Sequence, residues 1–132
     1  MAALDTHILV RFLVQDDAAQ GAAATRLIRA SMQSGSALFV PVTVLLELEW
    51  VLRSVFGFDK PTVLQTMFSL LASFELGFGS ESAVEAALAQ YGHGKADFAD
   101  CLHAALARGA GEEPLWTFDK TAAKVDGAKL WA

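Results

Sequence analysis

The sequence predicts an α/β fold in which a mainly parallel sheet of four to five strands is flanked by helices. Short apolar runs alternate with longer amphipathic stretches along the chain, which is the pattern of strands joined by crossover helices. Of the 132 residues, 54% are hydrophobic and 19% are charged, so the chain has enough apolar side chains for a packed core. We expect a single domain over residues 1–132.

In the first half of the chain, helix caps and breakers mark the expected boundaries. An apolar opening around Leu4 predicts a first strand. Asp16 and Asp17 are typical N-cap residues and Gly35 is a typical helix end, so a long helix is expected between them. The next strand stops at Pro41. The expected elements are a strand at Leu4, a short helix or turn at 6–14, a helix at 18–34, a strand at 37–40 and a helix at 42–56 that ends at Gly57.

The second half of the chain repeats the alternation. Asp59 and Pro61 predict a helix start, Ser80 and Asp97 are expected helix caps, and the glycines of 92–94 predict a break. The expected helices are 59–73, 80–91 and 97–108, and the expected strands are 74–78, 115–118 and an edge strand at 129–131. Functional groups in such a fold collect beyond the carboxyl ends of the strands.

Charge and composition bear on nucleic-acid binding, on disulfide bonds and on the cellular compartment of the protein. The net charge of −5 argues against binding nucleic acid by phosphate neutralisation alone, although divalent cations at an acidic cluster would change the local sign. A single cysteine, Cys101, excludes an internal disulfide and fits a reducing compartment. We find no apolar run of about 18 residues and no signal-peptide pattern, so we expect a cytoplasmic protein without a membrane partner.

Four aspartates stand at informative positions in the sequence. Asp5 and Asp119 each follow an expected strand, where an α/β sheet places its chemistry. The alternative is that each caps a following helix. Asp97 and Asp100 share a helical face, and two carboxylates one turn apart repel each other unless a cation or a proton intervenes. Asp97 is also well placed as an N-cap with Asp100 as its capping-box-like partner.

Glu47 and Glu49 lie on different faces of the helix expected at 42–56. A helical wheel groups the apolar residues into one stripe, made up of Val44, Leu48, Val51, Leu52 and Val55. Glu47 lies at the edge of this stripe, so we expect it at the margin of the core, paired with a metal ion, with a basic side chain or with water. Glu49 points away and is expected to form a solvated surface ion pair with Arg53.

The histidines favour no zinc site. His7, His93 and His103 lack the spacing of a histidine-rich metal centre, and His103, on the face of Asp100, is expected to pack or hydrogen-bond rather than to bind metal. Nucleotide-binding, P-loop, HExxH, CxxC and GxSxG motifs are missing from the sequence. An all-oxygen set of acids suits Mg²⁺ or Mn²⁺.

Four segments, in order, resemble the PIN-domain toxins of the VapC family: LDTHILVRFLVQDD, VTVLLELEWVLRSVFGF, KADFADCLHAALA and LWTFDK. The resemblance covers nearly the whole chain. It implies a PIN-like three-layer α/β/α fold and a ribonuclease of a type II toxin–antitoxin system. It implies a catalytic set of acids, which consists of Asp5, Glu47, Asp100 and Asp119, with Asp97, Thr6 and Thr117 as accessory residues. One departure is His7, which stands where relatives usually carry asparagine.

The resemblance also implies a reaction and partners. Asp5, Asp100 and Asp119 would bind Mg²⁺ or Mn²⁺, and Glu47 would bind metal or orient the attacking water, so that RNA is cleaved to a 5′-phosphate and a 3′-hydroxyl. A VapB-like antitoxin would block the site, and the apolar surplus makes a homodimer the expected assembly. Alternatives are a non-toxin nuclease or phosphoesterase and a non-catalytic RNA- or partner-binding PIN scaffold. A receiver-like domain is disfavoured because the strand at 74–78 ends without an aspartate.

Basic and aromatic side chains are the candidates for binding these partners. Those for RNA are Arg11, Arg26, Arg29, Lys95 and Lys120, with solvated surface charge as the alternative. Those for an antitoxin helix are Trp50, Phe56, Phe58 and Phe68, with core packing as the alternative.

Overall fold

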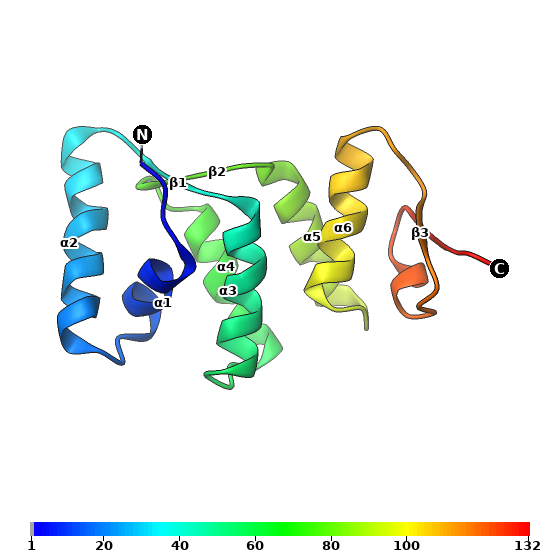
Figure 1. Ribbon diagram of the computed structural model, residues 1–132, viewed down its shortest axis with the longest axis horizontal. Helices are drawn as coiled ribbons and strands as arrows, with labels where there is room; N and C mark the ends of the chain where they lie inside the picture. The colour runs from blue at the N-terminus through cyan, green and yellow to red at the C-terminus, as the bar shows by residue number, and fades with distance from the viewer. Residues whose placement is uncertain (1) are drawn as a thin grey trace. The chain divides into compact units, whose positions relative to one another are not determined.

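The computed structural model describes residues 2–132 and divides them into two compact units. The first unit ends at Gly79 and the second is Ser80–Ala132. Both mix helices with short parallel strands, which confirms the α/β class (Figure 1).

The first unit is built from four helices and one pair of parallel strands. Its elements are α1 (Thr6–Val14), α2 (Ala18–Ser34), β1 (Leu38–Val40), α3 (Val42–Ser54), α4 (Lys60–Leu71) and β2 (Leu76–Phe78). Helix α1 packs against α2 and α3 (Figure 1). The fully buried side chains include Leu9 of α1, Leu45 and Leu52 of α3, and Met67 of α4. These apolar side chains, removed from water, hold the helices together.

The opening apolar run forms a bridge rather than a full strand. Ala3 pairs in parallel with Phe39, the N–H of Leu4 donates to the Phe39 carbonyl at 2.9 Å, and the N–H of Phe39 donates to the Ala2 carbonyl at 2.7 Å. Strand β1 therefore has this bridge on one edge and β2 on the other. The chain turns into α1 at Asp5, directly after the bridge.

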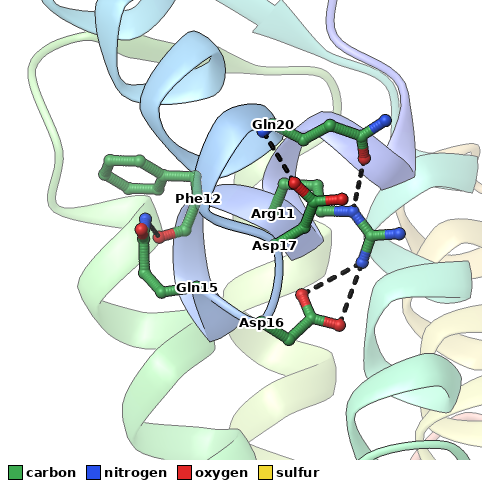
Figure 2. Close-up of polar contacts among 6 residues, drawn as sticks. All are labelled: Arg11, Phe12, Gln15, Asp16, Asp17 and Gln20. Carbon is green, nitrogen blue, oxygen red and sulfur yellow. Dashed lines mark hydrogen bonds and ion pairs between the residues drawn. The ribbon is translucent and has the colours of Figure 1, made fainter.

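The corner between α1 and α2 is fixed by side-chain hydrogen bonds (Figure 2). Arg11 binds Asp16 at 3.0 Å and Gln20 at 2.6 Å, and Asp17 caps α2 by accepting from the Gln20 N–H. Gln15, in the left-handed conformation that ends α1, donates to the Phe12 carbonyl. These contacts confirm the expected helix start after Asp17.

The second unit contains α5 (Glu81–His93), α6 (Phe98–Gly109), β3 (Leu115–Thr117), the short 3-10 helix η1 (Ala122–Lys124) and β4 (Ala128–Leu130). Helices α5 and α6 pack together around buried Leu88 and Leu102, and the rings of Tyr91 and Phe98 meet at 5.9 Å. Strands β3 and β4 run parallel, with Leu115 opposite Ala128.

The expectation of one sheet with four to five strands is wrong in this structure. The strands form two parallel pairs, β1–β2 and β3–β4, one in each unit, and each strand has three residues. Proline has no N–H to extend a ladder, and Pro41 follows β1 directly. The remaining local expectations needed small changes: α3 ends at Ser54, α5 continues through Gly92 to His93, and Ser80 begins α5 without a side-chain capping bond.

Candidate active site

In the first unit, Asp5 begins α1 with a capping hydrogen bond. Its Oδ1 accepts the Thr6 N–H at 2.7 Å, and its side chain is exposed. The capping alternative is therefore correct for Asp5, and it leaves the carboxylate open to solvent. A carboxylate can cap a helix through one oxygen and still present the other to a ligand.

Thr6 connects the start of α1 to the acid on α3. It is 2% exposed, and its hydroxyl donates a short hydrogen bond to Oε1 of Glu47. A buried threonine has a restricted rotamer, so its hydroxyl is a fixed donor. Thr6 therefore restrains the Glu47 carboxylate.

The two glutamates of α3 have the opposite burial to the one predicted. Glu47 is exposed, whereas Glu49 is 2% exposed. The predicted ion pair of Glu49 is confirmed, because the Arg53 Nε lies 2.8 Å from its Oε2. The buried face consists of Leu45, Leu48, Glu49 and Leu52. It is rotated from the predicted stripe because nearly every side of this helix carries apolar residues, which leaves the periodicity a weak guide.

In the second unit, Asp97 and Asp100 share the first turn of α6. Asp97 is the N-cap, and its Oδ1 accepts the Asp100 N–H at 2.9 Å, as the capping alternative expected. Asp100 is half-buried. Its burial raises the pKa of its carboxyl above the usual 3.8, and the neighbouring charges of Asp97 and Asp119 raise this pKa further. The fold therefore places Asp100 where a negative charge is disfavoured.

Asp119 organises the turn that follows β3. Its Oδ1 accepts the N–H groups of Thr121 at 2.7 Å and Ala122 at 3.1 Å, while its own N–H donates to the hydroxyl of Thr117. Both hydrogen bonds to the carboxylate end on Oδ1, so Oδ2 is the oxygen that remains for a ligand. Thr117 thus supports the Asp119 backbone.

His103, which was expected to pack or to form a hydrogen bond, is more exposed than that expectation implied. It is exposed on α6, one turn after Asp100, and its positive charge lowers the pKa of Asp100 against the other contributions. His7, next to Asp5, is also exposed. Both imidazoles are therefore available to solvent and to ligands.

The acids fit a hard cation by chemistry, but they do not form a complete ligand set. Across residues 2–132, no three His, Cys, Asp or Glu side chains are grouped closely enough to hold a metal ion. The donors are carboxylates, which Mg²⁺ and Mn²⁺ prefer. Burial and the charges of Asp97 and Asp119 raise the pKa of Asp100, and a nearby cation would favour its charged form. Of the four predicted acids, Asp5 and Glu47 belong to the first unit, and Asp100 and Asp119 belong to the second.

The candidate partner-binding side chains differ in availability. Arg26, Arg29, Lys95 and Lys120 are exposed, whereas Arg11 is half-buried and held by Asp16 and Gln20 (Figure 2). Arg11 would have to leave these partners to bind an RNA phosphate. Of the aromatic candidates, Trp50 is 54% and Phe68 is 44% exposed, while Phe56 and Phe58 are half-buried.

An aromatic patch beside Asp119 was not predicted. It consists of Trp116, Phe118 and Trp131, which are all exposed, and the two indole rings meet edge to face at 5.0 Å. The alternation of side chains along β3 puts Trp116 and Phe118 on one face, so the sequence carried a signal for the grouping but none for its exposure.

Comparison with known families identifies the fold. The sequence matches the PIN domain over residues 2–128, which includes all four acids. The chain belongs to the PIN-domain family. PIN domains are generally nucleases, so membership implies a nuclease-like fold. A search of curated proteins returned no match. None of the helices in the described part of this PIN domain is both long and apolar enough to cross a membrane.

Proposed function

We propose that this PIN domain is a metal-dependent endoribonuclease and the toxin of a type II toxin–antitoxin pair. Family membership over nearly the whole chain supports nuclease chemistry. The observation that supports metal dependence is the position of Asp100, which is partly buried and lies beside the charges of Asp97 and Asp119; burial first, and these charges second, raise the pKa of Asp100. Such a group is stabilised as a carboxylate by a bound cation.

In this proposal Asp5, Glu47, Asp100 and Asp119 serve one active site. Asp5, Asp100 and Asp119 would hold Mg²⁺ or Mn²⁺ through carboxylate oxygens, and Asp119 would use Oδ2, since its Oδ1 accepts the N–H groups of the following turn. When bound, the metal lowers the pKa of coordinated water and offsets charge on the phosphate oxygens. Thr6 restrains Glu47, so that its carboxylate binds metal or orients the attacking water.

The overall reaction is the hydrolysis of an RNA phosphodiester. The water oxygen bonds to phosphorus, the bond from phosphorus to the 3′-oxygen breaks, and the 3′-oxygen takes up a proton. The products are a 5′-phosphate and a 3′-hydroxyl. The protein contributes fixed carboxylates, which position the reacting groups before the reaction begins.

A cleavage assay tests the proposal. Purified protein is incubated with structured RNA in Mn²⁺, in Mn²⁺ with excess EDTA, and as the Asp5→Asn variant. Asp126→Asn, at an exposed acid outside the proposed site, is the matched control. We expect wild type and Asp126→Asn to cleave the RNA in Mn²⁺ without EDTA, and Asp5→Asn to leave it intact. Equal cleavage under all conditions would refute the metal-dependent mechanism.

Multiple variants test whether the four acids act as one site. Residues that act as a unit are strongly non-additive in their kinetic effects. We therefore expect Asp5→Asn with Asp119→Asn to lose little more activity than either single variant. Additive losses would mean that the acids of the two units act separately.

A non-catalytic PIN scaffold is the second candidate, because no three acids are grouped as metal ligands in residues 2–132. The same assay separates the two, since a scaffold binds RNA or protein but leaves RNA intact under every metal condition.

The proposed partners are RNA, a VapB-like antitoxin and a second copy of the chain. Exposed Trp50 and Phe68 on α3 and α4 are the proposed contacts for an antitoxin helix. Expression in bacteria should arrest growth, and co-expression of an antitoxin encoded beside the gene should restore it. Growth that is unaffected by expression of the active nuclease would contradict the toxin role.

A further inference from the structure

An exposed histidine lies on the same helical face as two acids of the second unit. Asp97, Asp100 and His103 follow one another at intervals of three residues along the start of α6. Residues spaced in this way are neighbours on the helix surface. His103 is exposed, although α6 buries Phe98, Cys101, Leu102 and Ala104 on its other side.

The surroundings of His103 indicate a binding role rather than a structural one. A core histidine is ruled out by its exposure, and a hard cation such as Mg²⁺ prefers oxygen ligands. The imidazole is near enough to Asp100 for its charge to act on that carboxyl, yet the structure gives it no ion pair within the described residues. It is therefore an N–H donor presented to solvent beside the acids.

A phosphodiester needs a hydrogen-bond donor, and the neighbouring acids supply none through their carboxylates. The non-bridging oxygens of a phosphodiester only accept hydrogen bonds, and so do the ionised side chains of Asp97, Asp100 and Asp119. Imidazole carries at least one N–H in either protonation state. Three residues advance an α-helix by about 4.5 Å, so His103 stands about one phosphate's width beyond Asp100.

We propose that His103 donates a hydrogen bond to a phosphate oxygen of the RNA bound at Asp100 and Asp119, as a substrate-binding residue of the site. This inference rests on the proposed ribonuclease function and adds a named contact to the substrate. The contact exists before the reaction and persists through it. It therefore contributes to binding in the ground state and the transition state alike, which affects KM rather than kcat.

Steady-state cleavage of one single-stranded RNA oligonucleotide tests the role of His103. We expect His103→Ala to raise KM about tenfold and to change kcat by less than about twofold, because one lost hydrogen bond to a charged group is worth about a factor of ten. His103→Gln, which keeps an N–H donor, should recover part of the loss. His93→Ala replaces another exposed histidine of the second unit and should match wild type. An unchanged KM in His103→Ala, or a loss confined to kcat, would overturn the proposal.

A binding measurement separates this inference from the proposed function. The affinity of Asp5→Asn for the same oligonucleotide in Mn²⁺ is compared with that of Asp5→Asn combined with His103→Ala. A tenfold weaker affinity of the double variant supports the contact even if the wild-type protein cleaves no RNA. Equal affinities, or no RNA binding by either protein, would overturn it. Circular dichroism should show both proteins folded, since His103 is a surface residue.

Discussion

The two groups of acids in this PIN domain are held in different ways. In the first unit, Asp5 and Glu47 each accept a hydrogen bond from Thr6, one from its backbone N–H and one from its hydroxyl. In the second unit, Asp100 lies beside two further carboxylates, and its pKa is raised by burial and by their charges. The acids of the first group share Thr6 as a donor. In the second group, backbone N–H groups fix Asp97 and Asp119, and Asp100 lies beside their charges.

This difference separates two kinds of contribution to a metal site. Hydrogen-bonded acids are satisfied by the fold and need no cation to keep their positions. Crowded acids remain unfavourable until a proton or a cation arrives. The second unit is therefore the part of the molecule in which metal binding and stability should be most closely linked.

The largest effect should come from removing the crowded charge. We expect Asp100→Asn to lower RNA cleavage at least about 100-fold, because a metal ligand is lost, while thermal unfolding without divalent metal stays the same or shifts upward. Cleavage rates and melting curves check the two halves of this prediction. Glu112→Gln, at an exposed acid of the same unit, is the control. If Asp100→Asn lowered the melting temperature as well as the cleavage rate, the proposed difference between the hydrogen-bonded acids and the crowded acids would be wrong.

Metal binding should stabilise the wild-type protein. Saturating Mn²⁺ at about 100 times its Kd is expected to add about 2.7 kcal/mol to the free energy of unfolding. Thermal shift in Mn²⁺ titrations measures this gain, and Asp119→Asn should show much less of it. An equal shift in both proteins would mean that the metal binds elsewhere.

A buried acid and an exposed acid on α3 give the next contrast. Glu49→Gln should lower the free energy of unfolding by about 1–3 kcal/mol, since it weakens a charged hydrogen bond to Arg53 at a buried carboxylate. Glu47→Gln should change it by less than about 1 kcal/mol, because Glu47 is exposed. Urea unfolding compares the two variants. RNA cleavage should fall more in Glu47→Gln than in Glu49→Gln. A larger loss of cleavage in Glu49→Gln would contradict the assignment of Glu47 to the site.

The raised pKa of Asp100 predicts a pH dependence of stability. In the native protein Asp100 holds its proton to a higher pH than the usual 3.8 of the unfolded chain. Between these two values the native state binds more protons, so stability falls as pH rises through the window. Metal-free unfolding from pH 3.8 upward should show this decline in wild type and a smaller decline in Asp100→Asn. Parallel curves would refute the assignment of the shift to Asp100.

The smallest effect is expected at Thr6. Thr6→Val removes the hydroxyl that restrains Glu47 and should lower activity by about threefold to tenfold, because one neutral donor is worth about 1 kcal/mol. Thr6→Ser keeps the donor and should retain most of the activity. Cleavage rates of both variants check this prediction, and equal losses in both would indicate that packing, rather than the hydrogen bond, is what matters.

The helices of this protein were largely predictable because their signals are local. Asp17 and Gly35 bracket α2 as expected, and Asp59 and Asp97 cap α4 and α6. Strand pairing was not predictable, since it joins segments far apart in the sequence, and the three-residue strands carry little pattern of their own. The 3-10 helix η1 was missed because a single turn needs no periodic apolar face.

The local hydrogen bonds of the candidate acids were partly predictable from the sequence, whereas their burial was not. The capping alternatives for Asp5 and Asp97 are confirmed, but Asp119 accepts the N–H groups of a turn and is not the N-cap of the following 3-10 helix. The burial of Glu49 instead of Glu47 was not predicted, because apolar residues lie on several faces of α3 and make those faces equally hydrophobic. Exposure of His103 likewise depends on which face of α6 meets its neighbours, and one sequence does not specify that.

The capping bonds of Asp5, Asp97 and Asp119 also bear on how such a domain changes over evolutionary time. Each of these bonds ends on Oδ1, and asparagine offers an equivalent carbonyl oxygen. A single Asp-to-Asn exchange at any of them therefore keeps the turn while removing the negative charge. In the proposed mechanism, one such substitution would convert a nuclease into a folded, inactive binding protein, because the hydrogen bonds that hold the turn would be kept.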